Sequence, residues 1–197
     1  MATELNETYW NTRYLNPDSG WDVGFITTPI KNYIDQLTDK QLKILIPGAG
    51  NSYEAEYLYK NGFTNVYVCD FAEEPLKNLK NRVPEFPEDQ LIKDDFFKLG
   101  LNDFDLIIEQ TFFCAIRPSL SQNYFHKMLE LLKPGGKLVG VLFNDVLNAD
   151  RPPFGGNQLQ YYSYFKNLFH IKTFETCYHS ILPRAGREIF INLQKPE

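Results

Sequence analysis

Hydrophobic positions along the chain follow two different spacings. Short, nearly continuous apolar runs are separated by segments in which apolar residues recur every three or four positions. The first pattern predicts buried strands and the second predicts amphipathic helices. The expected strands cover residues 42–46, 66–69, 91–92, 105–109, 137–143, 170–177 and 187–193. The expected helices cover residues 28–37, 51–61, 73–83, 119–132 and 158–167.

The order of these elements indicates an α/β fold. Strands and helices alternate from residue 42 to residue 143, which is typical of βαβ units and a parallel sheet. The almost uninterrupted apolar character of the strands favours a sheet with helices on both faces. Lys133–Gly136 is expected to be a turn, and the last two strands, with no helix between them, an antiparallel hairpin at the sheet edge. A length of 197 residues fits one domain, residues 1–197.

Composition and charge exclude several classes of function. No apolar run approaches the roughly 18 residues of a membrane span, and the first residues lack the apolar segment of a secretory signal. The net charge of −5 argues against a nucleic-acid partner and against an anionic membrane surface. Cys69, Cys114 and Cys177 form no CxxC pair, so we expect reduced thiols in a cytoplasmic protein. The three histidines have no metal-ligand spacing, and no metal site is expected.

A glycine-containing turn follows the first expected strand. Gly48 and Gly50 let the backbone turn sharply and approach a ligand closely. The third glycine of the dinucleotide fingerprint is missing, because Glu54 or Ala55 stands in its place. A tight turn without a ligand is the alternative. Asn51 and Glu54 have the spacing of a capping box for the next helix.

Acidic residues end the next two strands. Asp70 lies about 20 residues beyond Gly50, where an acidic residue can accept the ribose hydroxyls of a nucleoside. The alternative is that Asp70 caps the following helix. Asp95 follows the third strand beside Phe96, where a carboxylate can bond an adenine amino group while a ring covers the base. The alternative there is a solvated turn.

Acidic strand ends without a phosphate-binding lysine motif indicate a nucleoside ligand that lacks phosphates, and S-adenosylmethionine is the leading candidate. Its sulfonium requires a partner. Trp10, Tyr14 and Trp21 lie in a polar N-terminal segment, and aromatic faces attract a cation within about 6 Å. The alternative is that these rings only pack the N-terminus onto the domain. Arg184 to Arg187 is expected to be a charged hairpin turn.

Several blocks of sequence resemble the thiopurine methyltransferase family, and more closely its branch of halide and thiol methyltransferases. In chain order they are Trp10, Gly20–Gly24, Leu45–Gly50, Asp70, Asp95–Phe97, Phe104–Ile107, Phe112–Pro118, Leu131–Gly136 and Arg151–Phe154. They span nearly the whole chain. The Gly-Trp-Asp and Phe-Phe-Cys-Ala-Ile blocks are specific to the family, whereas Leu-Lys-Pro-Gly-Gly is common to class I methyltransferases.

The resemblance implies a class I methyltransferase with a Rossmann-like fold: a seven-stranded, mostly parallel sheet with an antiparallel C-terminal edge. Residues 1–27 would form a lid over S-adenosylmethionine, with S-adenosylhomocysteine as product. The acceptor would be a small soft nucleophile such as a thiol, a thiopurine or a halide. The implied cofactor-binding residues are Trp10, Tyr14, Trp21, Gly48, Gly50, Asp70, Asp95, Phe96 and either Gln110 or Thr111, and the implied acceptor-pocket residues are Arg117, Pro153 and Phe154.

Three departures from the family pattern bear on the site. Ala49 replaces a frequent cysteine, Tyr14 stands where the family often has a second tryptophan or a similar ring, and Asn144–Asn148 replaces a stretch that contributes to the acceptor pocket. Two other functions remain alternatives from the residues alone. One is a nicotinamide-dependent oxidoreductase on a similar fold, which the incomplete glycine fingerprint disfavours. The other is a cofactor-binding module without catalysis, which the aromatic N-terminus disfavours.

Overall fold

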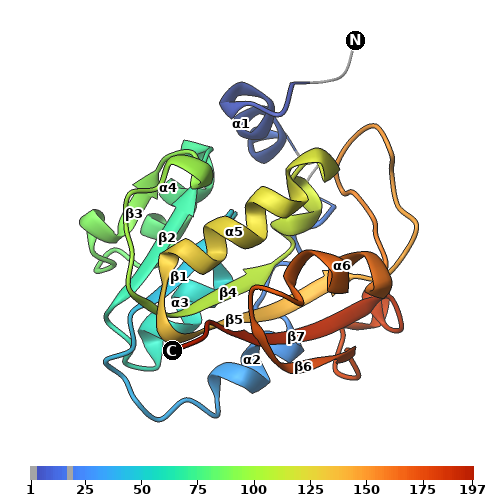
Figure 1. The fold of residues 1–197 in the computed structure, drawn as a ribbon. Helices are drawn as coiled ribbons and strands as arrows, with labels where there is room; N and C mark the ends of the chain where they lie inside the picture. The colour runs from blue at the N-terminus through green and yellow to red at the C-terminus, as the bar shows by residue number, and fades with distance from the viewer. Residues whose placement is uncertain (1–3, 17–19) are drawn as a thin grey trace.

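Seven strands form a single mixed sheet in the computed structural model, which describes residues 4–16 and 20–197 (Figure 1). The strand order is β3-β2-β1-β4-β5-β7-β6. The strands are β1 Ile44–Pro47, β2 Val66–Asp70, β3 Leu91–Lys93, β4 Phe104–Gln110, β5 Leu132–Phe143, β6 His170–Thr176 and β7 Glu188–Gln194. The pairs among β1 to β5 are parallel, and β7 is antiparallel to β5 and β6, which confirms the expected hairpin at the edge. Residues 1–3 and 17–19 of the expected lid lie outside the described residues.

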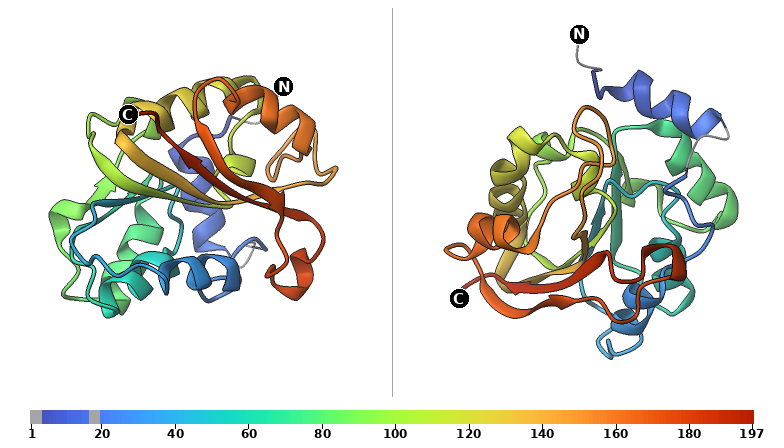
Figure 2. Two further views of the ribbon diagram at one scale, coloured as in Figure 1. Left: turned by 60° about the horizontal axis from the view of Figure 1, so that its bottom comes forward. Right: turned by 90° about the vertical axis from the view of Figure 1, so that its right-hand side faces the viewer.

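Helices cover both faces of the sheet, as Figure 2 shows in its left-hand view. They are α1 Glu7–Leu15, α2 Thr28–Ile34, α3 Tyr53–Lys60, α4 Glu73–Arg82, α5 Ser121–Leu131 and α6 Gln158–Phe165. Alternate residues of β1 point to opposite faces. Ile44 and Ile46 pack in the core under α2, α3 and α4, whereas Leu45 packs in the core under α5 and α6. Both faces of the strands are therefore buried, which is why these runs are apolar throughout.

The structure differs from the sequence prediction in three segments. The helix expected to end at residue 37 ends at Ile34, and a helix that the sequence pattern did not predict, α1, covers Glu7–Leu15. The turn expected at Lys133–Gly136 is instead part of β5. Gly135 and Gly136 exchange backbone hydrogen bonds with Lys195 just beyond β7, and the register against β4 shifts between Phe104 and Leu106. Gly135 and Gly136 therefore lie at an irregular pairing within β5, and they do not form a turn that precedes the strand.

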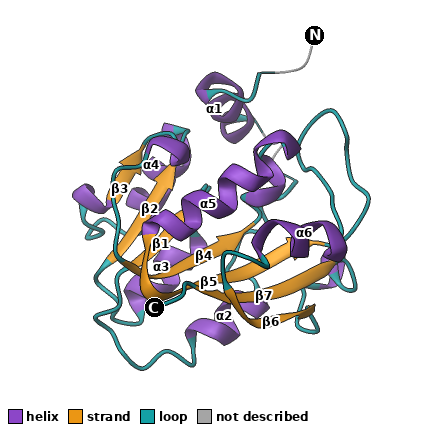
Figure 3. Cartoon of the chain, in the orientation of Figure 1, coloured by secondary structure: helices purple, strands orange, loops and turns teal. Residues whose placement is uncertain are grey.

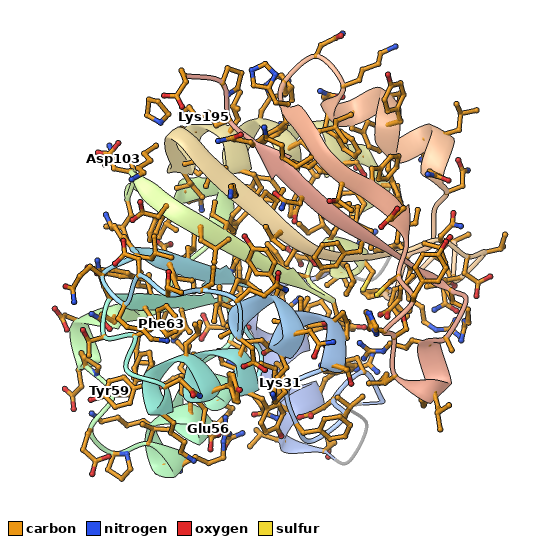
Figure 4. The ribbon with its side chains drawn as sticks, turned by 90° about the horizontal axis from the view of Figure 1, so that it is seen from below. Lys31, Glu56, Tyr59, Phe63, Asp103 and Lys195 are labelled. Carbon is orange, nitrogen blue, oxygen red and sulfur yellow. The ribbon has the colours of Figure 1, made fainter. Side chains whose placement is uncertain are left out.

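The parallel strands place all their carboxyl ends at one edge of the sheet. The loops that carry Phe63 and Asp103 precede β2 and β4, so they lie at the opposite, amino-terminal edge (Figure 4). Helix α1 stands beyond the carboxyl edge, and the long loop between β5 and α6 rises on the same side (Figure 3). Those two segments and the carboxyl ends of β1, β2 and β4 define the place where a ligand can bind.

Candidate functional site

A cavity of about 470 Å³ opens at the carboxyl ends of β1, β2 and β4. In the sheet β1 lies between β2 and β4, so the chain changes direction here, and open α/β sheets bind ligands at such a point. The candidate residues that line the cavity are Trp10, Tyr14, Trp21, Gly48, Gly50, Asp70, Asp95, Phe96, Gln110, Thr111, Arg117 and Pro153. Phe154 is not among the described lining residues. It is 5% exposed, and its backbone N–H donates to the Cys114 carbonyl at 2.7 Å.

The turn after β1 requires its two glycines. Gly48 and Gly50 have φ angles of +55° and +51°, which other residues rarely adopt. A Cβ atom at Gly48 would lie 1.9 Å from the ring of Phe112, and one at Gly50 would lie 2.9 Å from the hydroxyl of Tyr14. The absence of side chains thus lets the β4 loop and α1 close against this turn.

The predicted capping box after this turn is wrong. The residue before α3 is Ser52, in the left-handed region with φ of 52°, and it makes no side-chain cap. The side chain of Asn51 contacts other segments instead. Its Nδ2 donates to the Asp22 carboxylate, and its Oδ1 accepts from the Asn78 amide at 2.9 Å. Asn51 therefore ties the turn to the segment after α1 and to α4, rather than starting α3.

Asp70 ends β2 with its carboxyl group buried. One oxygen accepts the N–H of Gly50 and the other accepts the N–H of Ala72, both at 2.8 Å. Burial raises the pKa of this carboxyl to about 6, and the two backbone donors act against that rise. The residue before α4 is Ala72, so Asp70 bonds the backbone at the start of α4 without being its cap residue. The carboxylate keeps unused lone pairs for a ligand.

Asp95 and Phe96 form the wall beyond β3. The Asp95 carboxylate accepts the N–H of Phe97 at 3.0 Å and lies 3.7 Å from the Lys98 ammonium. The ring of Phe96 packs edge-to-face against Phe112, with 5.1 Å between their centroids. A carboxylate oxygen and an apolar ring therefore both belong to the cavity wall, and their role in binding a base stays a prediction.

The loop after β4 is held by a buried carboxyl group. Glu109 accepts the backbone N–H of Phe112 at 2.8 Å, that of Phe113 at 3.0 Å and the hydroxyl of Tyr124. Burial raises the pKa of Glu109 to about 7. Its bonds fix the turn in which Thr111 adopts a φ of +59°. Because the Phe112 ring lies against Gly48, Glu109 positions the floor of the cavity from beneath.

Gln110 carries an unpartnered donor. Its side-chain oxygen accepts the hydroxyl of Thr27 at 2.7 Å, which fixes the orientation of the amide. Its Nε2 atom is buried and has no hydrogen-bond partner. An unsatisfied buried donor costs about 1–3 kcal/mol, so this atom is a candidate donor to a ligand in the cavity.

Aromatic rings from the N-terminal segment close the cavity on one side. Trp21 meets Trp10 and Tyr14 edge-to-face, with centroid separations of 6.0 and 5.7 Å. The guanidinium of Arg13 lies 4.6 Å above the Trp21 ring. Burial and the charge of Asp70 raise the pKa of Tyr14, which keeps its hydroxyl neutral. The three predicted rings therefore form one cluster at the cavity rather than separate contacts.

Polar contacts attach helix α1 to α4 and β3, and the helix has no fully buried residue. The side-chain oxygen of Asn11 accepts the N–H groups of Glu73 and Glu74 at 3.0 and 3.3 Å. Lys93 pairs with Glu7 at 2.7 Å. Asn11 thus supplies the cap that the start of α4 lacks in its own sequence, and this contact sets the position of α1 over the cavity.

Arg184, which was expected to belong to a charged hairpin turn, is a buried residue that lines the cavity. It is 7% exposed, its Nη2 donates to the Trp21 carbonyl at 2.7 Å, and it lies 3.7 Å from the buried Glu188 carboxylate. Burial raises the pKa of Glu188. The spacing of charges in the sequence gave no sign of this burial, because the partner, Trp21, lies 163 positions away.

Glu54 is a second residue that sequence reasoning missed. It lies in the first turn of α3, lines the cavity and is 6% exposed. Burial raises the pKa of its carboxyl to about 7. Its position just after the glycine turn was the available signal, but its spacing to Asn51 suggested a cap.

Metal sites and membrane-spanning helices are both absent from the described residues. No group of three or more histidine, cysteine, aspartate or glutamate residues within residues 4–16 and 20–197 could hold a metal ion. In the same part of the chain, no helix is long and apolar enough to cross a membrane.

Comparisons with protein sequences show one family. The model for "Thiopurine S-methyltransferase" matches residues 5–194. "Thiocyanate methyltransferase 1" of Arabidopsis thaliana is 25% identical over 197 residues, which covers 95% of this chain and 86% of that protein. "Thiopurine S-methyltransferase" of Vibrio cholerae serotype O1 is 22% identical over 162 residues, which covers 74% of each chain.

Comparisons with solved structures confirm the fold class predicted from the sequence. The 1,6-didemethyltoxoflavin-N1-methyltransferase of Burkholderia thailandensis, with bound S-adenosylhomocysteine, aligns with a TM-score of 0.78 at 16% identity, over 97% of this chain and 87% of that one. N-methyltransferase NodS of Bradyrhizobium japonicum WM9, in complex with S-adenosylhomocysteine, aligns with a TM-score of 0.72 at 14% identity, over 98% and 100% of the two chains. At these identities the likeness concerns the fold alone.

Proposed function

The chain belongs to the thiopurine S-methyltransferase family, and we propose that the cavity at the carboxyl ends of β1, β2 and β4 is its active site. The protein is an S-adenosylmethionine-dependent methyltransferase that acts on a small molecule with a thiol-type nucleophile. The observation that carries the assignment of the cavity is the buried carboxylate of Asp70 beside the glycine turn, in a cavity that the Trp10, Tyr14 and Trp21 cluster also lines.

The residues of the cavity fit this cofactor. The glycine turn lines the cavity with backbone beside Tyr14 and Phe112, and Asp70 offers acceptor capacity for a pair of hydroxyl groups. Gln110 offers a buried donor without a partner. Three aromatic rings offer π-faces, which attract a sulfonium as they attract other cations. A dinucleotide would instead require room for a pyrophosphate at the turn, where Tyr14 and Phe112 already lie.

We assign the ends of the cavity from these chemistries. Asp70 would accept the ribose hydroxyls, and Asp95 with Phe96 would hold the adenine. Gly48 and Gly50 would lie under the cofactor. The methionyl end would lie by Gln110 and Thr111, with the sulfonium near the Trp10, Tyr14 and Trp21 cluster. Support for this order comes from the sequence of strand ends along the cavity wall, β3, β2, β1 and β4.

The acceptor would bind between Arg117 and the loop that carries Pro153. Both residues line the cavity, and Phe154 supports this loop from the core through its bond to Cys114. Arg117 would attract an anionic acceptor. The surrounding rings and prolines would strip water from it, and desolvation makes a soft anion a better nucleophile.

The cofactor supplies an electrophilic methyl group. This chain's residues would orient the nucleophile in line with it and exclude water, and alignment provides much of the rate enhancement in such transfers. No strong base is required, because a free thiol with a pKa of about 8.5 is already partly ionised at pH 7. Cys114 plays no nucleophilic part in this scheme, since burial raises its pKa and its thiol donates to the Thr111 carbonyl at 3.2 Å.

The finer features of this function are also proposals. We propose one domain over residues 1–197, with residues 1–27 as a lid over the cofactor. The net charge of −5 supports an acceptor other than nucleic acid. The three cysteines, which are free and buried among the described residues, support a cytoplasmic location.

An acceptor panel tests the proposed function. Purified protein is incubated with methyl-labelled S-adenosylmethionine and, separately, with a small aliphatic thiol, a thiopurine, thiocyanate, iodide, total RNA and a protein mixture. We expect labelled methyl product from at least one small soft nucleophile and none from RNA or protein. Methylation of RNA or protein alone would contradict the assignment of the acceptor pocket.

A further inference from the structure

Glu54 is a buried carboxyl group on the cavity wall that the roles above do not use. It lies in the first turn of α3, directly after the glycine turn and Ser52. Its neighbours with charge come from three other elements: Arg184 before β7, Asp22 in the segment after α1, and Arg82 on α4.

Each of these charged neighbours is already bonded elsewhere. Arg184 donates to the Trp21 carbonyl and pairs with Glu188. Asp22 accepts from Gly24 at 2.8 Å, from the Asn51 amide and from the Tyr53 hydroxyl at 3.4 Å. Arg82 donates to Glu56 at 2.6 Å and to the Asn51 carbonyl.

The Glu54 carboxyl group stands apart from these contacts. Within the described residues, its one hydrogen bond is to its own backbone N–H. A buried carboxyl group in that state holds its proton more tightly, as the raised pKa of Glu54 shows, or is ionised by a cationic or donor partner that a ligand supplies.

Unpartnered donors lie on the same wall. The described residues contain five buried side-chain polar atoms without a hydrogen-bond partner, and three of them belong to residues that line the cavity: Ser52 Oγ, Gln110 Nε2 and Arg184 Nη1, of which the last lies 3.7 Å from the Glu188 carboxylate. All three atoms can donate. Ser52 lies in the turn between β1 and α3, and Gln110 is the last residue of β4. Because β1 and β4 are adjacent parallel strands, both residues lie at the same edge of the sheet, and both line the cavity. Their missing partner is therefore an acceptor group, whereas the missing partner of Glu54 is a donor group.

An α-amino acid zwitterion matches both requirements, because it carries an acceptor carboxylate and a donor ammonium group on the same carbon atom. We propose that Glu54 binds the α-ammonium group of the cofactor's methionyl end, and that Ser52 Oγ and Gln110 Nε2 donate to its α-carboxylate. The roles of Glu54 and Ser52 rest on the proposed function of the cavity and deepen it. In this arrangement Glu54 selects ligands that carry the amino acid from ligands that carry only the thioadenosine part.

The test compares ligands that differ only at this end. Isothermal titration measures the affinity of the unaltered protein for S-adenosylhomocysteine, for its analogue without the amino group, and for 5′-methylthioadenosine, which lacks the whole amino acid. We expect the loss of the amino group alone to weaken binding at least tenfold. Equal affinity for S-adenosylhomocysteine and the desamino analogue would overturn the proposal without any substitution in the chain.

Two variants locate the effect. Glu54→Gln is expected to bind S-adenosylhomocysteine at least tenfold more weakly and 5′-methylthioadenosine within twofold of the unaltered protein. Ser52→Ala is expected to show the same selectivity with a smaller loss. Glu74→Gln, the same substitution in the first turn of α4, is the control, because its side chain pairs with Lys77 and does not line the cavity.

The outcomes separate this proposal from the function on which it rests. A Glu54→Gln variant that keeps its affinity for S-adenosylhomocysteine, or that loses both ligands equally, overturns the role of Glu54. Failure of the unaltered protein to bind either ligand would instead contradict the proposed function of the cavity.

Discussion

The side-chain carboxylate of Asp70 accepts the backbone N–H of Gly50 at 2.8 Å, across 20 positions of sequence. The two residues follow neighbouring parallel strands, in which Pro47 is in register with Cys69. The bond fixes the glycine turn against the end of β2. Asp70 therefore acts on the site in two ways, as a potential ligand for the ribose and as a support for the turn beneath the cofactor.

Replacement of Asp70 by alanine should lower the affinity for S-adenosylhomocysteine by about 1–3 kcal/mol, because hydrogen bonds to a charged group are lost. Isothermal titration measures this loss. Affinity for 5′-methylthioadenosine should fall equally, since both ligands contain the ribose. Unchanged affinity for both ligands in Asp70→Ala would sink the ribose assignment.

Deletion of residues 1–23 should leave a folded domain without methyltransferase activity. Helix α1 buries no residue, so its loss removes little of the core. The deletion also removes Trp10, Tyr14 and Trp21 from the cavity, and we expect S-adenosylhomocysteine to bind at least tenfold more weakly. Circular dichroism checks the fold and titration checks the affinity. Full activity in the shortened protein would show that the rings only pack against the domain.

Replacement of Arg117 by alanine should raise the KM for an anionic acceptor by about tenfold, as expected for the loss of one charged hydrogen bond. The KM for a neutral acceptor should change less, because no charge is there to be attracted. Arg151→Ala is a matched control, since Arg151 is exposed and pairs with Asp150 at 3.5 Å. An equal rise for both acceptors would argue that Arg117 supports the pocket without touching the substrate.

The ligand-free protein should be more stable at pH 5.5 than at pH 7.5. Burial raises the pKa of Asp70 to about 6 and those of Glu54 and Glu109 to about 7, whereas such groups titrate near pH 4 in an unfolded chain. Between these values the folded state holds more protons than the unfolded state. The free energy of unfolding therefore falls as the pH rises.

Urea titrations at several pH values measure this dependence. Glu109→Gln should flatten it, because the variant removes one of the buried carboxyl groups whose pKa is raised. A urea concentration at the unfolding midpoint that rises from pH 5.5 to pH 7.5 would show that these carboxyl groups are not buried as described.

The sheet could be predicted because its strands are apolar on both faces. Runs such as 42–46 and 105–109 show that pattern directly. The antiparallel edge could be predicted because no helical pattern lies between the last two strands. Helix α1 could not be predicted in the same way. Its aromatic residues Trp10 and Tyr14 face a cavity, so the spacing typical of a core-facing helix is absent.

Apart from the N-terminal rings Trp10, Tyr14 and Trp21 and the residues that the family resemblance implied, the candidate site was predictable where a residue follows directly from a predicted strand. Asp70 and the glycine turn have that position, and Asp95 and Gln110 share it. Arg184 and Glu54 do not directly follow a strand, so their position in the sequence does not indicate a role in the site. Arg184 acquires its role through a contact with Trp21 far away in the chain, and Glu54 resembles an ordinary helix-start residue until its burial is known.

Tryptophan emission offers the most direct test of the central claim that this cavity binds the cofactor. The chain has two tryptophans, Trp10 and Trp21, and both line the cavity. All tryptophan emission therefore reports on the site. Titration of the intact protein with S-adenosylhomocysteine should give a saturable change in emission with one site per chain, and titration with NAD should give none. No change with S-adenosylhomocysteine, or an equal change with NAD, would contradict the account.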